Sequence, residues 1–310
     1  MRFDNIFQMV GNTPAVRIRM EEADKTKIYI KLEGCNPTGS LKDRPCIKSI
    51  EDAKEKGFLE KGMTILDASS GNYACSVAYF GKILGYPAKV IASSKLTRDK
   101  RDFIKYYDGE LIQVGDYTFH GNQYCQNLVK NDRSGRYCFL DQLHNWANPQ
   151  AHYESTAVEI YTEFPDADMV VGSLGTGATK FGVGAYLKSK NSNTKIIAVQ
   201  AASGTKIPGT GAFDDGDYIT PFIRKGIDDG LFDEMPKIDL KSAIRRTLQL
   251  REQGIYCGIQ TGGLLHVTLN QIRQTNSKRE VVLISGDAGW KNAEVLLRIF
   301  SEKEIASNNR

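Results

Sequence analysis

The sequence predicts an α/β protein whose mostly parallel sheets are covered by helices on both faces. Apolar stretches of strand length alternate with segments of helical periodicity along most of the 310 residues. This alternation is typical of parallel sheets, because each crossover between strands returns over one face and covers it. The length, with 41% hydrophobic residues, indicates a well-packed core and about two domains.

The first part of the chain opens with a turn at residues 10–14 and then alternates between the two kinds of element. Pro45 fits best in the first turn of a helix, so a helix should begin near residues 42–44. Small residues recur at helical spacing between Ala74 and Leu84, which predicts a helix packed closely on a sheet. The expected strands are 15–18, 27–32, 63–67, 89–92 and 110–114, and further helices are expected at 97–108 and 121–130.

The second part continues the alternation towards the C-terminus. The expected helices are 152–163, 180–188, 240–252, one from Gly262, and 291–302, and the expected strands are 168–172, 195–200, 255–259 and 281–285. Residues 201–239 interrupt the pattern, because they are rich in Gly, Asp and Pro and lack clear periodicity. We expect a stretch of this length without regular elements to be a functional loop or a lid.

Composition and charge exclude several classes of protein. The net charge is only +4 and positive residues are scattered, so no nucleic-acid partner is expected. No apolar run approaches the ~20 residues that span a bilayer. The N-terminus lacks the apolar stretch of a signal peptide, so we expect a cytoplasmic protein without a membrane segment. The six cysteines form no C-x-x-C pair and the four histidines lack zinc-site spacing, so we expect reduced thiols and no metal.

Lys42 is the candidate reactive residue. It stands in residues 31–44, KLEGCNPTGSLKDR, where Pro37 and Gly39 indicate a turn that leads into a helix. A lysine buried at such a junction has a lowered pKa, and its free amine can hold a carbonyl cofactor as an imine. Taken alone, the Lys-Asp-Arg run is better explained by a solvated lysine before a surface helix. Three loops elsewhere in the chain favour the reactive role.

These glycine-bearing loops are expected beyond the carboxyl ends of strands, where α/β sheets bind ligands. Residues 175–179, GTGAT, combine close backbone approach and hydroxyl donors with a helix N-terminus, which suits a phosphate; a plain β–α turn is the alternative. Residues 69–73, SSGNY, suit a substrate carboxylate, or else provide a helix N-cap at Ser70. Residues 258–263, GIQTGG, contain no carboxylate, so they would offer a heterocyclic nitrogen only a hydroxyl or an amide, or they form an ordinary turn.

A reactive lysine, a phosphate-binding loop, an anion-binding loop and a neutral polar loop together indicate a pyridoxal phosphate site. The chain resembles the cysteine synthase and cystathionine β-synthase family of fold-type II pyridoxal phosphate enzymes, from about residue 11 to residue 289. The matching stretches, in the family's order, are residues 36–44, 69–72, 142–153 (QLHNWANPQAHY), 175–179 and 258–262. The resemblance implies two domains of the tryptophan synthase β type. Residues 41–145 would form a small mobile domain, and residues 1–40 and 146–310 a large cofactor-binding domain.

The resemblance also implies roles for individual residues. Lys42 would bind the cofactor covalently and act as general base and acid. The cofactor-binding residues would be Lys42, Asn72, Gly175, Thr176, Gly177, Ala178, Thr179, Gln260 and Thr261. Asn72 would meet the ring oxygen, residues 175–179 the phosphate, and either Gln260 or Thr261 the pyridine nitrogen. The substrate-binding residues would be Ser69, Ser70, Asn72, Tyr73 and Gln142, with Tyr73 placing a bulky phenol near the substrate and the other four holding the α-carboxylate.

A neutral partner for the pyridine nitrogen favours β-replacement, because carbanion charge is then better discharged by expelling a β-substituent than stored on the ring. We therefore expect replacement on O-acetylserine or O-phosphoserine through an aminoacrylate, with sulfide or another thiol or amine as nucleophile. Departures from the family's synthases at Tyr73, residues 118–121, Gln260 and residues 201–239 leave both the leaving group and the nucleophile open. Arg224 or Lys225 could meet a phosphate, although simple solvation explains them better.

Two alternatives remain. A serine or threonine dehydratase, or a threonine synthase, would share the Ser-Ser-Gly-Asn loop, whereas the run from Gln142 to Pro149 favours the synthase branch. A catalytically inactive binding or regulatory homologue would have no need of Lys42. The resemblance further implies a homodimer that acts on a small amino-acid substrate.

Overall fold

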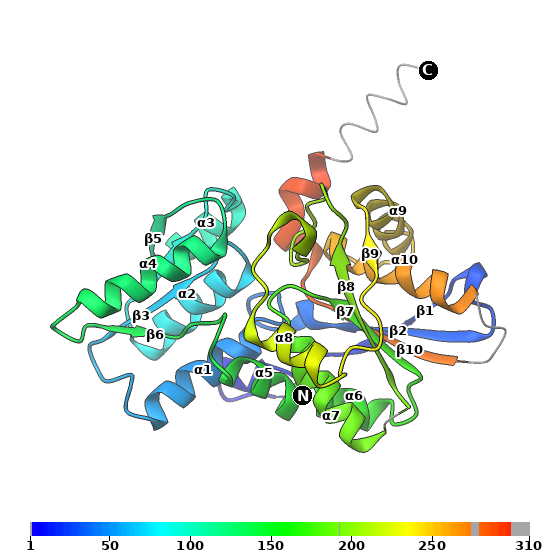
Figure 1. The fold of residues 1–310 in the computed structure, drawn as a ribbon, viewed down its shortest axis with the longest axis horizontal. Helices are drawn as coiled ribbons and strands as arrows, with labels where there is room; N and C mark the ends of the chain where they lie inside the picture. Colours follow the sequence, from blue (N-terminus) through cyan, green and yellow to red (C-terminus); the bar gives the residue numbers. More distant parts are fainter. Residues whose placement is uncertain (1, 192, 274–278, 299–310) are drawn as a thin grey trace, which may run out of the picture.

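A computed structural model describes residues 2–191, 193–273 and 279–298, and the chain forms two sheets flanked by helices (Figure 1). The larger sheet has the strand order β1-β2-β10-β7-β8-β9, and the smaller sheet has the order β5-β4-β3-β6. All four strands of the smaller sheet lie between residues 41 and 145, and all six strands of the larger sheet lie outside that range. The exact bounds of the two domains stay a prediction.

The larger sheet is parallel except at one edge, where β1 pairs antiparallel with β2. Its strands are β1 (Ala15–Ile18), β2 (Thr26–Leu32), β7 (Met169–Ser173), β8 (Lys195–Ala201), β9 (Lys237–Ile238) and β10 (Arg279–Ser285). One face packs against α6 (Ala157–Glu163) and α7 (Ala178–Lys190), and the other against α9 (Leu240–Arg251) and α10 (Ile259–Arg273). Side chains alternate between these faces along β7, so Val170 points to α7 and Val171 to α10.

The smaller sheet is entirely parallel. Its strands are β3 (Thr64–Ala68), β4 (Ala88–Ala92), β5 (Glu110–Gln113) and β6 (Tyr137–Phe139). The helices α1 (Asp43–Glu55), α2 (Asn72–Leu84) and α3 (Arg98–Tyr106) share a core cluster on one face, and α4 (Thr118–Asn131) covers the other. Sheets buried on both faces have apolar strands such as Ile65-Leu66, so the predicted architecture is confirmed.

Two local predictions were wrong. Residues 255–259 do not form a strand: Cys257 makes only an isolated bridge to Ala288, and α10 already begins at Ile259. A short apolar run cannot distinguish a strand from the first turn of a buried helix. Residues 201–239 are not structureless, because they contain α8 (Pro221–Asp228) and β9. The signal for α8 was present, since Thr220 caps the helix through its hydroxyl and Pro221 occupies the first turn.

Other elements differ in extent. The strand β6 was not expected, and the helix predicted at 152–163 begins earlier, with α5 (Ala147–Ala151) and a π-helical segment (His152–Thr156) preceding α6. The helix predicted at 291–302 is described only up to residue 298, and it follows a 3₁₀ turn at Gly289–Asn292. The part predicted beyond residue 298 lies outside the described residues.

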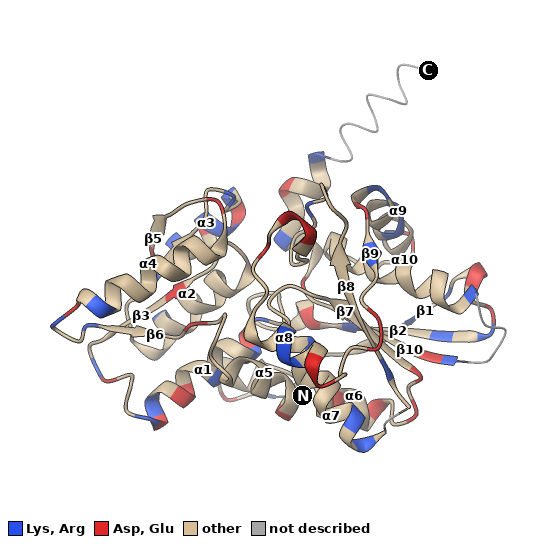
Figure 2. Cartoon of the chain, in the orientation of Figure 1, with Lys and Arg blue, Asp and Glu red and all other residues tan. Residues whose placement is uncertain are grey.

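Charged residues of both signs are interspersed over both sheets and their helices (Figure 2). All six cysteines are free; Cys35 is exposed and the other five are buried. Within the described parts of the chain, no helix has the length and apolarity of a bilayer span.

Candidate active site

Lys42 lies immediately before α1, at the end of a turn that buried hydrogen bonds hold in place. The next residue, Asp43, accepts hydrogen bonds from the Thr38 backbone N–H at 2.7 Å and from the Thr38 hydroxyl at 2.5 Å. Ser76 of α2 donates to the same carboxylate at 2.7 Å. Burial raises the pKa of Asp43, while these hydrogen bonds act in the opposite direction. The backbone at Lys42 is therefore fixed from the α2 side.

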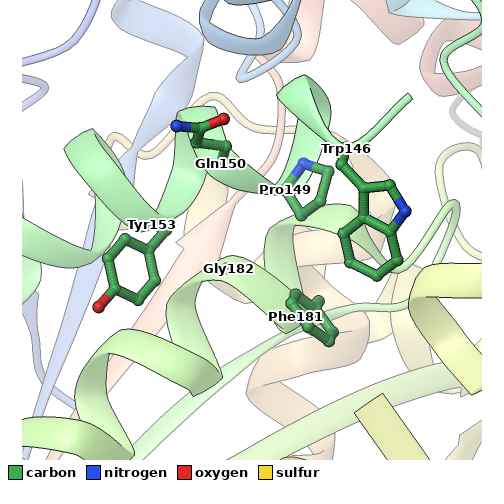
Figure 3. A pocket seen from close by; sticks show the side chains of 6 residues that line it. All are labelled: Trp146, Pro149, Gln150, Tyr153, Phe181 and Gly182. Carbon is green, nitrogen blue, oxygen red and sulfur yellow. The ribbon is translucent and has the colours of Figure 1, made fainter. Parts of the chain in front are cut away.

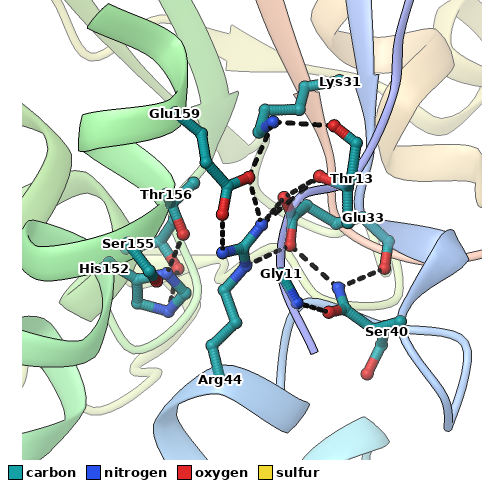
Figure 4. A network of polar contacts seen from close by, with 12 residues as sticks. Gly11, Thr13, Lys31, Glu33, Ser40, Arg44, His152, Ser155, Thr156 and Glu159 are labelled. Atoms are coloured by element: carbon teal, nitrogen blue, oxygen red, sulfur yellow. Dashed lines mark hydrogen bonds and ion pairs between the residues drawn. The ribbon is translucent and has the colours of Figure 1, made fainter. Parts of the chain in front are cut away.

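Arg44 fixes the same turn from the opposite side through a buried ion-pair network (Figure 4). Its guanidinium donates to both oxygens of Glu33 at 2.8 Å, and to Glu159 of α6 at 2.6 and 2.8 Å. Lys31 pairs with Glu159 at 2.9 Å and donates to the carbonyl of Thr13. Burial raises the pKa of Glu159, but Arg44 and Lys31 outweigh it and hold that pKa at about 2. The network joins α1, β2 and α6 around Lys42.

The environment of Lys42 favours the uncharged form of its amine. The side chain keeps some exposed surface, but protein surrounds the amine, and this burial lowers its pKa to about 8. No neighbouring carboxylate contributes to the shift, so nothing stabilises the ammonium form. A free amine at a fixed position is the form that attacks a carbonyl.

The Ser69–Asn72 loop lies at the carboxyl end of β3, beside Gln142. The Gln142 amide donates to the Ala68 carbonyl at 2.5 Å, which places its side chain against the start of this loop. The Ser69 hydroxyl accepts from the Gly71 N–H at 3.2 Å. Ser70 differs from expectation, because its hydroxyl bonds the hydroxyl and the N–H of Ser93, at 2.7 and 2.5 Å. Ser70 ties the loop to the end of β4, and it caps no helix.

Tyr73 corrects a second expectation. Its side chain is 1% exposed and belongs to the core cluster between α1, α2 and β3. Burial raises the pKa of its phenol well above the ordinary value, and the neighbouring hydroxyl is that of Ser49 in α1. The first turn of α2 directs position 73 into the core, so the phenol does not occupy the place near the substrate that the sequence suggested.

The loop at residues 175–179 leads from β7 into α7. Gly177 has φ +82°, and a Cβ at this position would lie 2.4 Å from the Ile223 side chain, so glycine is required for this approach to α8. The Thr176 carbonyl accepts from the Thr220 hydroxyl at 2.6 Å. Ala178 begins α7 and is buried. The loop thus presents its backbone at the N-terminus of a buried helix.

Thr179, in the first turn of α7, is oriented by His152. Its hydroxyl lies 3.2 Å from His152 Nε2, and His152 Nδ1 lies 2.9 Å from the Thr156 hydroxyl. Burial lowers the pKa of His152 well below the ordinary value, and Lys42 and Arg44 act in the same direction. A neutral imidazole therefore positions the Thr179 hydroxyl at the head of the helix.

Gln260 and Thr261 lie in the first turn of α10. The Gln260 carbonyl accepts from the Ser173 hydroxyl at 2.5 Å, and its amide donates to Asp287 at 3.0 Å. Thr261 is fully buried, with its hydroxyl 2.9 Å from that of Ser285. Of the two residues, Gln260 is the one whose side chain reaches the neighbouring loops, because Gly209 and Gly286 both lie against its amide group.

Asp287 is the site residue that the sequence did not reveal. It follows β10, and its carboxylate accepts from the side-chain amides of Asn72 at 2.9 Å, Asn292 at 3.0 Å and Gln260 at 3.0 Å. The third loop contains no carboxylate, as predicted, but one stands directly behind it. The only available signal was an acid immediately after a buried strand.

The residues present fit pyridoxal phosphate. Asn72 Oδ1 is buried and has no hydrogen-bond partner among the described residues, which indicates that a ligand group normally lies beside it. The amine of Lys42 suits the aldehyde, the 175–179 loop suits the phosphate, and Gln260 offers a neutral amide. Asp287 joins Asn72 of the smaller sheet's loop to Gln260 of the larger sheet's side, and the turn before Lys42 bonds Gly286 beside it.

Comparison with known proteins identifies the family. The family model described as pyridoxal-phosphate dependent enzyme matches residues 6–287. This chain belongs to that family. Cysteine synthase B of Pseudomonas aeruginosa is 33% identical over 287 residues, covering 92% of this chain and 94% of the relative. Cysteine synthase B of Escherichia coli is 31% identical over 287 residues, with 91% and 92% covered.

Solved structures agree with this assignment. A hydrogen sulfide-producing enzyme from Fusobacterium nucleatum matches with a TM-score of 0.86 and 28% identity, covering 94% of this chain and 99% of the other. O-ureido-L-serine synthase matches with a TM-score of 0.84 and 26% identity, covering 94% of each chain. The predictions of the family, the fold-type II architecture, the pyridoxal phosphate cofactor and a β-replacement enzyme are confirmed.

Proposed function

We propose that this enzyme replaces the acetyl ester of O-acetylserine with sulfide, forming cysteine. A small thiol is the second candidate nucleophile. Within the β-replacement class, acetate is then the leaving group and sulfide the preferred nucleophile. The observation that carries the proposal is the link between the Lys42 turn and the loops: the Leu41 N–H donates to the Gly286 carbonyl, and the adjacent Asp287 accepts from Asn72 and Gln260.

We assign the residue roles on the same geometry. When bound, the cofactor supplies an electron sink that acidifies the α-proton of the amino acid. Lys42 holds the cofactor's aldehyde carbon and later moves the proton at the substrate's α-carbon. Ser69 and Gln142 bind the α-carboxylate, and Asn72 donates to the ring oxygen. The backbone of Gly175–Thr179 and the Thr179 hydroxyl bind the phosphate.

Gln260 supports replacement rather than transamination. Its side-chain amide donates one N–H to Asp287 and keeps a second N–H for the pyridine nitrogen. The carboxylate of Asp287 accepts hydrogen bonds from the amides of Asn72, Asn292 and Gln260, so its charge is offset by these three donors. An amide from Gln260 at the pyridine nitrogen would leave that nitrogen unprotonated and so favour loss of the β-substituent.

The cations of the segment between β8 and α9 favour an uncharged β-substituent, such as an acetyl ester that leaves as acetate, over a phosphate ester. Lys206 is exposed, and Arg224 and Lys225 lie on the exposed face of α8. Lys225 pairs with Asp229 at 2.9 Å, one turn along the same helix. A phosphate ester would need a buried or convergent cation. These three side chains offer neither, which favours O-acetylserine over O-phosphoserine.

The test is product analysis with the purified, cofactor-loaded enzyme. We expect cysteine from O-acetylserine and sulfide, with at least a tenfold lower kcat/KM for O-phosphoserine. Steady release of pyruvate without an added nucleophile would instead identify a dehydratase. Absence of turnover with every serine derivative, in an enzyme that binds the cofactor, would identify an inactive homologue. The Lys42→Ala variant is the negative control.

We also propose that the enzyme is a cytoplasmic homodimer. An apolar hollow of about 250 Å³ opens between α5 and α7, lined by Trp146, Pro149, Gln150, Tyr153, Phe181 and Gly182 (Figure 3). Trp146 is 44% exposed and Tyr153 40%, which leaves two large aromatic side chains for a second copy to cover. Light scattering after gel filtration should give about twice the chain mass, and Trp146→Glu should shift the protein towards monomer.

A further inference from the structure

A chain of four side chains connects the helices of the smaller sheet with the segment between β8 and α8. Asp141 Oδ1 lies 2.8 Å from His144 Nδ1, and His144 Nε2 lies 2.8 Å from the hydroxyl of Tyr218. The Tyr218 ring stacks on Phe119 of α4, with ring centroids 4.5 Å apart and planes at 20°. Residues 119, 141 and 144 come from one side of the site, and residue 218 comes from the other.

The hydrogen bonds in this chain have a defined direction. Asp141 Oδ1 also accepts from the Asn122 side-chain amide at 2.7 Å, so it acts as an acceptor. His144 therefore donates through Nδ1, and in the neutral imidazole Nε2 accepts from the Tyr218 hydroxyl. Asp141 has φ +51°, a strained backbone conformation for a residue other than glycine, and such strain gathers at functional sites.

Both ends of the chain are next to proposed ligand-binding residues. Asp141 directly precedes Gln142, which lies against the Ser69 loop. Tyr218 stands two residues before Thr220, whose hydroxyl holds the Thr176 carbonyl in the phosphate-binding loop at 2.6 Å. The His144–Tyr218 hydrogen bond thus joins the segment beside Gln142 to the segment beside the proposed phosphate-binding loop.

We propose that Tyr218 is the specificity-determining gate of the reaction, held across the entrance by His144 and Phe119 so that only small nucleophiles reach the β-carbon. This inference rests on the proposed function. One hydrogen bond and one ring stack are weak enough to open in each cycle, since each corresponds to roughly a fivefold change in an equilibrium. His144 and Asp141 are positioning residues, because they act on the ring through its hydroxyl.

The decisive experiment compares kcat/KM for sulfide and for a bulky aromatic thiol, both with O-acetylserine. Tyr218→Ala removes the ring and should raise the ratio of bulky to small nucleophile by at least tenfold. Tyr218→Phe keeps the ring and loses the hydrogen bond, so the ratio should rise only about threefold to fivefold. His144→Ala should match Tyr218→Phe, and the double variant should add nothing further. Tyr124→Ala, which removes an exposed tyrosine from α4, is the matched control.

A second readout does not depend on turnover. Acrylamide should quench the fluorescence of the bound cofactor at least threefold more strongly in Tyr218→Ala than in the wild type or Tyr124→Ala. An unchanged nucleophile ratio together with unchanged quenching would show that Tyr218 only secures its own segment, and would overturn the gate. If the wild type uses no serine derivative, the proposed function fails, and the quenching comparison still decides whether Tyr218 closes the site.

Discussion

Two lysines, Lys42 and Lys180, lie at the N-terminal ends of different helices, and burial lowers the pKa of both amines, to about 8 and about 7. Lys42 precedes α1 with some surface exposed, and Asp43 and Arg44 anchor its turn through buried hydrogen bonds. Lys180 is 1% exposed in α7, and its amine has no hydrogen-bond partner among the described residues.

The two lysines differ in the exposure of their side chains and in the hydrogen bonds that anchor the backbone around them. The Lys180 amine fills the space above Gly172 in β7, where an added Cβ would lie 2.2 Å from Nζ. Lys42 instead keeps some exposed surface at the start of α1. Burial lowers the pKa of both amines, and we infer that only the anchored, accessible lysine does the chemistry. Four predictions test this contrast, from the largest effect to the smallest.

Lys42→Ala should lower turnover by at least ~10³-fold, because both the covalent attachment of the cofactor and the proton transfer depend on this amine. Lys180→Met should retain most of the activity. Product formation gives the rates, and borohydride reduction followed by peptide mapping should locate the cofactor on Lys42 alone. A label on Lys180 would contradict the assignment.

Glu33→Gln should destabilise the protein by about 3 kcal/mol, because it leaves the buried Arg44 guanidinium without one of its two carboxylates. Urea unfolding followed by circular dichroism measures the change. Glu60→Gln, an exposed change before β3, serves as control and should fall within ~0.5 kcal/mol of the wild type. Equal stability of both variants would mean that the network does not anchor the Lys42 turn.

Lys180→Met should stabilise the cofactor-free protein by about 2 kcal/mol at pH 7, since it removes a buried amine without a partner. The folded pKa is about 7 and the ordinary value is 10.5, so between these values only the unfolded state binds the proton. Wild-type stability therefore rises with pH across that window, and the advantage of the variant should shrink from pH 7 towards pH 10. Lys190→Met, at the exposed end of α7, should give no such trend.

The rate of cofactor binding to the cofactor-free protein should rise about tenfold from pH 7 to about pH 9, with a midpoint near pH 8, and then level off, following the free amine of Lys42. Stopped-flow absorbance in the visible range measures it. Lys180→Met should give the same profile. A midpoint near the ordinary lysine value of 10.5 would show that burial does not tune Lys42.

The sequence by itself determined most of the alternation of strands and helices, and it singled out Lys42 and three glycine-bearing loops. These features are local: Pro45 sets a helix start, Gly177 permits a positive φ, and apolar periodicity selects strand or helix over a few residues. Motif order then identified the family, because Lys42, Asn72 and the 175–179 loop occur in the expected sequence.

Only the tertiary structure decided which side chains meet. Asp287 bonds Asn72 across 215 positions, and His144 meets Tyr218 across 74. Packing also decided the places of Tyr73 and Ser70, whose residue types suited a substrate. The Tyr73 side chain lies in the core around α2, and the Ser70 hydroxyl bonds Ser93 at the end of β4. The physical reason is that a one-residue step in a helix or strand changes the face a side chain occupies, and that choice depends on what packs against it.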